Sequence, residues 1–368
     1  MQLQVSQSCS LPRKMKRLIK WDSKTNRAIE SGLAFLAVAQ TTAGEIPIYT
    51  CDRRDMVGEL HPDPCVFPTA LAAYALGFVP GAELLLERAI HFLVEQRSPS
   101  GVWHHWRNDH AHFTMLPPDV DDTSCVSLVL NRHGVSGAAD RRILLENRNR
   151  EGLFYTWLLP RLRWTSAPHR LVMLEQLRLI MTQGPFFRNM SAAADDVDAV
   201  VNANCLSALG PFKGDALVIN YLLRVLRAGK EASCDKWYDS AFAVWYFFSR
   251  VLPGRAPEAA ELIVQRMASV APKDALELAH GISSMISCKQ RPADTWITSL
   301  LDSQLANGAW PSATIYIGGR VRGPDGWFGN PPPGTPYWGS EAMTTAFCLQ
   351  ALAQWRDCSA TSFRPNDS

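Results

Sequence analysis

Apolar residues recur at intervals of three and four along most of the chain, the spacing that places them on one face of an α-helix. The first such segment is NRAIESGLAFLAVAQ, residues 26–40, whose start Asp22 or Ser23 can cap. Nine further segments show this spacing: residues 68–78, 81–96, 123–133, 199–210, 216–229, 240–252, 256–270, 274–286 and 340–355. No stretch of alternating apolar and polar residues predicts a sheet. We therefore predict an all-α protein.

A repeat indicates how the helices are arranged. The stretches RAIHFLVEQRSPSGVW (residues 88–103) and SLLDSQLANGAW (residues 299–310) both run from apolar helix residues through Gln to Gly and Trp. Weaker copies are LAFLAVAQTTAGEI (residues 33–46) and LLENRNREGLF (residues 144–154). A period of about fifty residues indicates stacked helix pairs that share a core. Six such pairs closing on themselves give a double-layered (α/α)6 barrel.

Each repeat has a mechanical explanation. A Gln near a helix end can donate to the carbonyls that the helix leaves unpaired, and a Gly permits the turn that follows. The Trp then packs over the start of the next helix. We expect Trp103 and Trp310, with their Gln residues, to stabilise the fold and take no part in chemistry.

Length and composition limit the class of protein. A chain of 368 residues with 47% hydrophobic and 20% charged residues can bury one large core. We expect a single domain at residues 21–357, between a flexible basic N-terminal tail (1–20) and a flexible C-terminal tail (358–368). The net charge of +2 does not suggest a nucleic-acid partner.

The cysteines and the N-terminus bear on location. Nine cysteines, an odd number with no CxxC pair, do not form a disulfide framework and fit a reduced, cytoplasmic compartment. The N-terminal RKMKRLIK has no apolar core that would make it a secretory signal. No apolar run is long enough to span a membrane, although the basic N-terminus can contact anionic lipid at its surface.

Three carboxylates stand directly before an apolar helix in PPDVDDTSCVSLVL, residues 117–130. Asp119, Asp121 and Asp122 fall within four residues. A plain helix start explains part of this, with Asp119 as the cap and Asp122 in the first turn. Crowded carboxylates in a site without water also resist joint ionisation and keep a proton among them. The motif is therefore a candidate for acid chemistry.

Together, the two patterns resemble one family. The Gln-to-Trp repeats resemble the QW motifs of squalene–hopene and oxidosqualene cyclases, and DVDDTS resembles the DxDD signature of class II terpene cyclases. The resemblance runs from about Trp21 to Trp355, in a short form with a single barrel domain. It implies a class II cyclase that protonates a linear isoprenoid, with Asp121 as the general acid and Asp119 and Asp122 supporting it.

Protonation of an alkene requires carboxyl groups that lie close together. An alkene is a very weak base, whereas an ordinary Asp with a pKa of about 3.9 is ionised at neutral pH. Neighbouring carboxylates retain the proton, but they also weaken the acid. A helix that begins near Thr123 compensates, because its first N–H groups stabilise the anion left behind.

A second acidic stretch, ADDVDAVVNANCL (residues 194–206), leaves two possibilities open. It is either a capped helix with an exposed acidic start, or it supplies an inward polar group or a Mg²⁺ site for a diphosphate. Asn202 and Asn204 are candidates for the substrate cavity, but they lie about 200° apart on a helix, so only one can readily face it.

Aromatic side chains can stabilise carbocations without supplying a nucleophile. Trp237 and Tyr238 are candidates, as are Tyr337 and Trp338, which follow a Pro-rich loop at the start of a helix. The His-rich HHWRNDHAH, residues 104–112, has no cysteine near it in the sequence, and we predict no metal site. This loop and the Gly/Pro-rich segment at residues 316–336 are expected to cover the barrel mouth.

The substrate has alternatives. The favoured one is farnesyl or geranylgeranyl diphosphate with the diphosphate retained, met by Arg320 and Arg322 and by such residues as Arg53, Arg54 and Arg107. Mg²⁺ would then enter only through the diphosphate, and no organic cofactor is expected. The other possibilities are a neutral polyprenyl chain (a prenylated aromatic or a triterpene) and a barrel that binds an isoprenoid without turnover. The sequence does not fix the oligomeric state.

Overall fold

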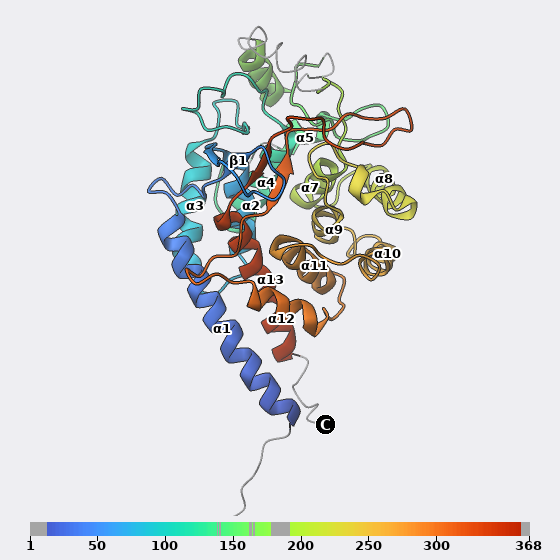
Figure 1. Cartoon of the computed structure of the whole chain (residues 1–368). Coiled ribbons are helices and arrows are strands. Elements are labelled where there is room, and N and C mark those ends of the chain that lie inside the picture. The colour runs from blue at the N-terminus through green and yellow to red at the C-terminus, as the bar shows by residue number, and fades with distance from the viewer. Residues whose placement is uncertain are drawn as a thin grey trace, which may run out of the picture.

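The fold is a closed ring of helices (Figure 1). The computed structural model describes residues 13–137, 139, 141–161, 164, 166–177 and 192–361, with side chains from residue 23 to 359. Six helices form the inner layer, and each contacts the next around the ring until the last meets the first. They are α2 (Val66–Leu76), α4 (Val120–Arg132), α7 (Ala199–Leu209), α9 (Ala241–Ser249), α11 (Ala275–Ser287) and α13 (Glu341–Thr361).

The inner and outer helices differ in sequence because they are buried to different extents. Inner helices such as α7 are buried on almost every side, so they are apolar all round. Outer helices such as α8 bury only one stripe, which includes Val218, Leu222 and Leu226. The outer elements are α1 (Arg13–Ala39), α3 (Glu83–Glu95), α8 (Asp215–Ala228), α10 (Pro257–Met267) and α12 (Asp294–Asp302). Helix α5 (Arg141–Glu146), a helix at residues 167–177 and a 3₁₀ turn, η1 (Glu231–Ser233), complete the described helices. The predicted all-α fold is confirmed.

A small sheet at one end of the ring was not predicted. Four short strands, β1 (Tyr49–Cys51), β2 (His61–Pro62), β3 (Thr314–Ile317) and β4 (Tyr337–Gly339), pair antiparallel in the order β2-β1-β4-β3. Strands of two to four residues are too short to show an alternating pattern in the sequence. The pairing of β1 with β4 joins the beginning of the barrel to its end.

Gln40 and Gln304 bond as the sequence predicts, whereas the Gln96 side chain accepts from the backbone N–H of Asn108 at 2.9 Å. Gln40 Nε2 donates to the carbonyl oxygens of Gly44 and Leu85, each at 2.9 Å. Gln304 Nε2 makes the same pair of bonds at 2.9 Å, to Gly308 and to a carbonyl of α1. Gly44 has a φ of 94°, and a Cβ added there would lie 2.1 Å from a backbone oxygen of α3. The turn therefore needs glycine for its conformation and for its close approach to the neighbouring helix.

The Trp residues close the same junctions. Trp103 and Trp310 are fully buried, and each indole N–H donates at 2.7 Å to a carbonyl in the preceding outer helix, Leu93 and Leu300. In four repeats the backbone N–H at the Trp position donates to a side chain near the start of the next inner helix: Ile46 to Thr69, Trp103 to Thr123, Phe154 to Asn202 and Trp310 to Thr345. The repeat thereby fixes where each inner helix begins, including the helix that carries the acid motif.

The ends of the chain differ from the expected tails. Helix α1 begins at Arg13, within the segment expected to be a flexible tail, and α13 continues to Thr361. In the part of the chain that the structure describes, no helix is both long and apolar enough to cross a membrane.

Candidate active site

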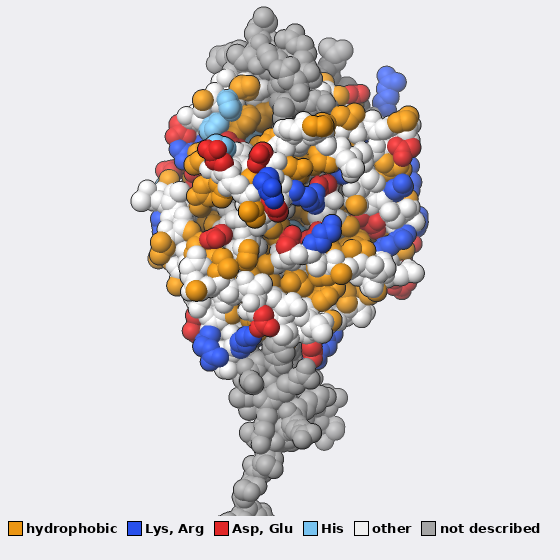
Figure 2. All heavy atoms as spheres, in the orientation of Figure 1, with side chains coloured by type: hydrophobic (Ala, Val, Ile, Leu, Met, Phe, Trp, Pro, Cys, Tyr) orange, Lys and Arg blue, Asp and Glu red, His pale blue; other side chains and the backbone are white. Residues whose placement is uncertain are grey.

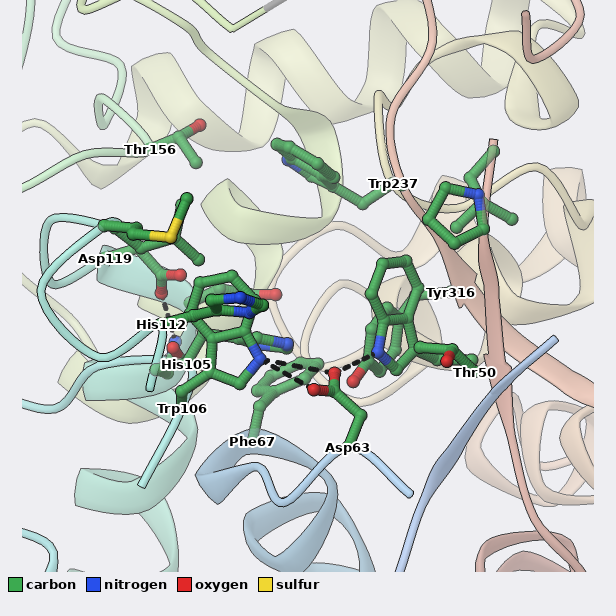
Figure 3. A pocket seen from close by; sticks show the side chains of 18 of the residues that line it. Thr50, Asp63, Phe67, His105, Trp106, His112, Asp119, Thr156, Trp237 and Tyr316 are labelled. Atoms are coloured by element: carbon green, nitrogen blue, oxygen red, sulfur yellow. Dashed lines mark hydrogen bonds between the residues drawn. The ribbon is translucent and has the colours of Figure 1, made fainter. Parts of the chain in front are cut away.

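A cavity of about 610 Å³ lies between the inner helices and the small sheet (Figure 3). All three aspartates of the acid motif line it. Most of the remaining wall is apolar or aromatic, and its large rings are Phe67, Trp106, Trp157, Trp237, Tyr238, Tyr316 and Trp338. The cavity therefore combines a mainly apolar wall, suited to a hydrocarbon, with a cluster of three carboxyl groups.

The acid motif forms the start of α4. Asp119 is the N-cap, and its side chain accepts a 2.6 Å hydrogen bond from the backbone N–H of Asp122. Asp121 and Asp122 follow in the first turn, where they are 8% and 1% exposed. The helix-start explanation is thus confirmed, and capping by Asp119 also holds the other two carboxyl groups at the cavity wall.

Asp121 has two hydrogen-bond donors from other inner elements. Asn204 Nδ2 on α7 lies 2.7 Å from Asp121 Oδ1, and the Tyr238 hydroxyl lies 3.3 Å from Oδ2. Burial, followed by the negative charge of Asp119, raises the pKa of Asp121 to about 7, although both donors act to lower it. Asp121 therefore carries its proton in a large fraction of molecules at neutral pH, with donors in place to stabilise the anion.

The two flanking carboxyl groups differ from each other. Burial raises the pKa of Asp119 to about 6, moderated by backbone N–H groups of the helix start. Burial and the charges of Asp119 and Asp121 raise the pKa of Asp122 well above its ordinary value. Asp122 is thus the protonated member, and it bonds to Asp119 as a neutral acid.

The candidate asparagines take separate roles, as their angular separation implies. Asn204 reaches Asp121, as described above. Asn202 exchanges hydrogen bonds with the backbone of Phe154, donating to its carbonyl at 3.1 Å and accepting from its N–H at 2.9 Å. Asn202 holds a repeat junction and does not line the cavity.

Three of the four candidate aromatics line the cavity. Trp237 and Tyr238 come from the loop before α9, and Trp338 comes from β4. The Trp237 ring lies edge-on to Trp157, with centroids 5.9 Å apart. Tyr337 does not line the cavity, because successive residues of a strand point to opposite faces and Trp338 takes the inward position.

The structure places the candidate phosphate-binding arginines outside the cavity. Arg320 is almost fully buried, and its guanidinium donates to backbone carbonyls of Ala232, Asp235 and Tyr238. Arg322 donates to the carbonyls of Val197 and Gly326 and lines a separate surface hollow. Arg320 therefore fastens the loop that presents Trp237 and Tyr238.

The other basic candidates are already paired. Arg53 forms an ion pair with Asp55, Arg54 with Asp239, and Arg107 with Glu45 and Asp109. Figure 2 shows basic and acidic side chains next to one another near the centre of the face it presents. Among the described residues that line the cavity, none is Lys or Arg.

The second acidic stretch is structural where the structure describes it. Asp198 is the residue before α7, and it accepts hydrogen bonds from Thr156 at 2.7 Å and the Trp237 indole at 3.2 Å. Asp196 pairs with Lys236 at 2.5 Å, and Asp195 is exposed. These contacts hold Asp196 and Asp198 in the loop that leads into α7.

The two segments expected to cover the barrel mouth differ in how much of the cavity they line. The His-rich loop lines the cavity with His105, Trp106, His110 and His112 and continues along it to Leu116. The Gly/Pro-rich segment contributes only its two ends, Tyr316–Gly318 and Pro336. Its middle, including Trp327 and Phe328, lines the separate hollow with Arg322. This corrects the prediction that the whole segment closes the mouth.

Sequence reasoning did not single out several residues that line or support the cavity. Phe67 and Trp157 line it but belong to no motif, and Asp235, which is outside the lining, fixes the Trp237 loop by accepting from its backbone N–H at 2.9 Å. Asp63 and His105 also line the wall and meet Cys65. The Asp-Pro-Cys triplet was the only local signal for the last set, and it lies far from the His-rich loop in the sequence.

Comparison with known proteins supports the fold. A scan against protein-family models finds no match, and a sequence search of curated proteins finds none. Among solved structures, a protein from Actinoplanes matches with a TM-score of 0.62 and 18% identity, over 90% of this chain and 99% of that chain. The type II terpene cyclase MstE from Scytonema, in complex with geranylgeranyl dihydroxybenzoate, matches with a TM-score of 0.60 and 16% identity, over 92% of this chain and 99% of that chain. Its complex with the product merosterolic acid A matches with a TM-score of 0.62, 15% identity and the same coverage. The chain thus has the fold of a type II terpene cyclase.

Proposed function

We propose that this protein is a class II terpene cyclase, which starts cyclisation by protonating a carbon–carbon double bond of a linear isoprenoid. The observation that carries the proposal is the setting of Asp121. Its carboxyl group lies in an aromatic cavity, is held by Asn204 and Tyr238, and has its pKa raised to about 7.

The acid step follows from this arrangement. Asp121 gives its proton to one alkene carbon, and the π electrons form the new C–H bond, leaving a cation on the other carbon. The carboxylate that remains keeps its bonds from Asn204 and Tyr238 and lies in the first turn of α4, whose N–H groups favour an anion. At the end of the cascade, loss of a proton to a base or capture of a nucleophile quenches the last cation.

The aromatic cavity wall stabilises the carbocations that form during cyclisation. The rings of Trp157 and Trp237 contact each other, Tyr316 contacts Phe67 and Trp338, and all five residues line the cavity. Aromatic faces attract cations through their quadrupoles and offer no lone pair that would end the reaction early. The volume of about 610 Å³ lies within the range of roughly 300–1,000 Å³ typical of small-molecule sites.

The charges around the cavity favour a substrate without a diphosphate. Its described lining carries no Lys or Arg, so no cation there would offset the charge of a diphosphate. The arginines expected to bind phosphates are committed to carboxylates or carbonyls. We therefore assign a prenylated aromatic without a diphosphate, of the kind that MstE binds, whose head group carries a single carboxylate; no Mg²⁺ is then needed.

The test is turnover by the purified chain. Geranylgeranyl dihydroxybenzoate, farnesyl and geranylgeranyl diphosphate, and squalene are incubated separately, with and without added Mg²⁺, and the extracts are analysed by mass spectrometry. We expect cyclic product from the prenylated aromatic without Mg²⁺ and none from Asp121→Asn. Cyclisation of the diphosphates alone would overturn the head-group assignment but keep the class. If the isoprenoids bind but are all recovered unchanged, the protein is a barrel that binds isoprenoids without turnover, and the proposal that it is an enzyme is refuted.

A further inference from the structure

Three metal-binding side chains converge at the cavity wall. Asp63 and Cys65 lie at the end of β2 and the start of α2, and His105 comes from the His-rich loop forty residues later. One donor atom from each, a carboxylate oxygen, Sγ and a ring nitrogen, lies within 4.8 Å of the others. Asp63 and His105 also line the cavity, and Figure 3 shows them close together below Trp237.

The distances around Cys65 fit a tetrahedral ion. Its Sγ lies 3.3 Å from Asp63 Oδ2 and 3.4 Å from His105 Nε2. Ligands bound to Zn²⁺ at about 2.0–2.3 Å with tetrahedral angles are separated by about 3.5 Å. These two separations therefore need little adjustment to accept an ion.

We propose that Asp63, Cys65 and His105 bind one Zn²⁺ ion at the wall of the cavity. Thiolate, imidazole and carboxylate are the donors that zinc prefers, whereas Mg²⁺ and Ca²⁺ take oxygen ligands. Three protein ligands leave a fourth position, and because two of the three line the cavity, that position faces the cavity. A water molecule or an oxygen atom of a bound small molecule fills it.

The local charge balance favours a cation. Among the described residues, no Lys or Arg pairs with Asp63, whose polar partners are two indoles, the Cys65 thiol and His110. A thiolate and a carboxylate would balance Zn²⁺.

The site is held in place from outside. The Trp106 and Trp338 indoles donate to Asp63 at 3.0 and 2.6 Å, and so fix the carboxylate. The backbone N–H of Val66 donates to the His105 carbonyl at 2.8 Å, and Cys65 and Trp106 form a β-bridge. Such outer contacts orient metal ligands, and their loss commonly lowers metal affinity by about 10- to 100-fold.

Metal binding is measured directly, without reference to turnover. The full-length protein is stripped with a chelator, dialysed and titrated with Zn²⁺ against a fluorescent zinc indicator, then separately with Co²⁺. We expect one Zn²⁺ per chain. With Co²⁺ we expect a thiolate-to-cobalt charge-transfer band and the strong visible bands of tetrahedral cobalt. One proton should leave per ion, because a thiol binds a metal ion as the thiolate.

Variants assign the ligands. Cys65→Ala should abolish the charge-transfer band, and His105→Ala and Asp63→Asn should each weaken Zn²⁺ binding by more than about 100-fold. Trp106→Phe should weaken it by about 10- to 100-fold, since it removes a donor to Asp63. The matched control is Cys51→Ala, which removes another buried cysteine near the sheet and should leave both metals bound.

Circular dichroism establishes that each variant is folded. Failure of folded wild-type protein to bind Zn²⁺ or Co²⁺ stoichiometrically would overturn the proposal. A charge-transfer band that survives in folded Cys65→Ala would also overturn it, because the thiolate would then come from elsewhere. Should Cys65→Ala not fold, the smaller change Cys65→Ser is used: loss of the band in the folded Cys65→Ser protein supports the site, and persistence of the band refutes it.

Discussion

Asn204 and Asp121 are 83 residues apart in the sequence, yet Asn204 Nδ2 donates to Asp121 Oδ1 at 2.7 Å. The bond joins α7 to α4, neighbouring helices of the inner ring. It stabilises the charged form of a carboxyl group that burial keeps largely neutral. The pKa of Asp121 is therefore set by two opposed effects. Burial in the cavity raises it, and the hydrogen bond from Asn204 on the neighbouring helix lowers it.

Replacing Asp121 with Asn should lower cyclisation by about 10²- to 10⁴-fold or more, because the side chain no longer has an acidic proton. The fold should persist, since Asn fills nearly the same volume. Product formation is measured by mass spectrometry and folding by circular dichroism. Asp195→Asn, in the exposed part of the second acidic stretch, is the control and should retain full activity. Full activity in Asp121→Asn would rule out the acid step.

Asn204→Ala and Tyr238→Phe should change the pH profile. Wild-type turnover should fall as pH rises through about 7, because the protonated form of Asp121 is the reactant. Both donors lower the pKa of Asp121, so removing either raises that pKa and moves the alkaline limb to higher pH. The plateau at low pH should fall by about 10- to 100-fold, because a hydrogen bond to a charged group contributes about 1.5–3 kcal/mol. A lower plateau with an unmoved limb would indicate a purely structural role.

Trp103→Ala and Trp310→Ala should each lower the free energy of unfolding by about 3–5 kcal/mol, because each removes a fully buried indole. Each change also deprives a helix carbonyl of its donor. Denaturant unfolding measures the loss, and Trp327→Ala, in the partly buried surface hollow, is the milder control. A variant that unfolds like wild type but makes a different product would contradict the structural role of the repeats.

Trp237→Ala should divert products toward alcohols quenched by water. The change removes an aromatic face from the cavity wall and opens space beside Trp157. Trp237→Phe keeps a ring and should stay closer to the wild-type product mixture. Products are identified by mass spectrometry in water enriched with ¹⁸O, so that oxygen from solvent is counted. An unchanged product mixture in Trp237→Ala would exclude this residue from cation shielding.

The helical spacing and the repeats were sufficient to predict the two layers, because each repeat marks the end of an outer helix by local bonds. Gln40 bonds to Gly44, four residues on, and the Trp310 indole to Leu300, ten residues back. The bonds that join one helix pair to the next, such as Gln40 to Leu85, are not local. The acid motif was also visible, since its three carboxyl groups share one helix start. These features depend on near neighbours along the chain.

Features that depend on distant segments were not predictable. Which of Asn202 and Asn204 reaches Asp121 depends on how α7 is rotated in the ring, and the sequence shows only that both cannot do so. Trp338 rather than Tyr337 points inward because of the register between β4 and β1, which are nearly the whole chain apart. The guanidinium of Arg320 finds its carbonyl partners about 85 residues earlier in the sequence, so no local pattern marks it as structural.

The closure of the ring has a consequence for synthesis in the cell. Helix α2 has α13 as a neighbour and β1 has β4, so a chain emerging from the ribosome lacks these partners until residues 337–361 have been made. Until then the apolar flank of α2 stays uncovered, and contacts between such distant segments form slowly. The ring therefore cannot close, and the cavity cannot form, before α13 has left the ribosome.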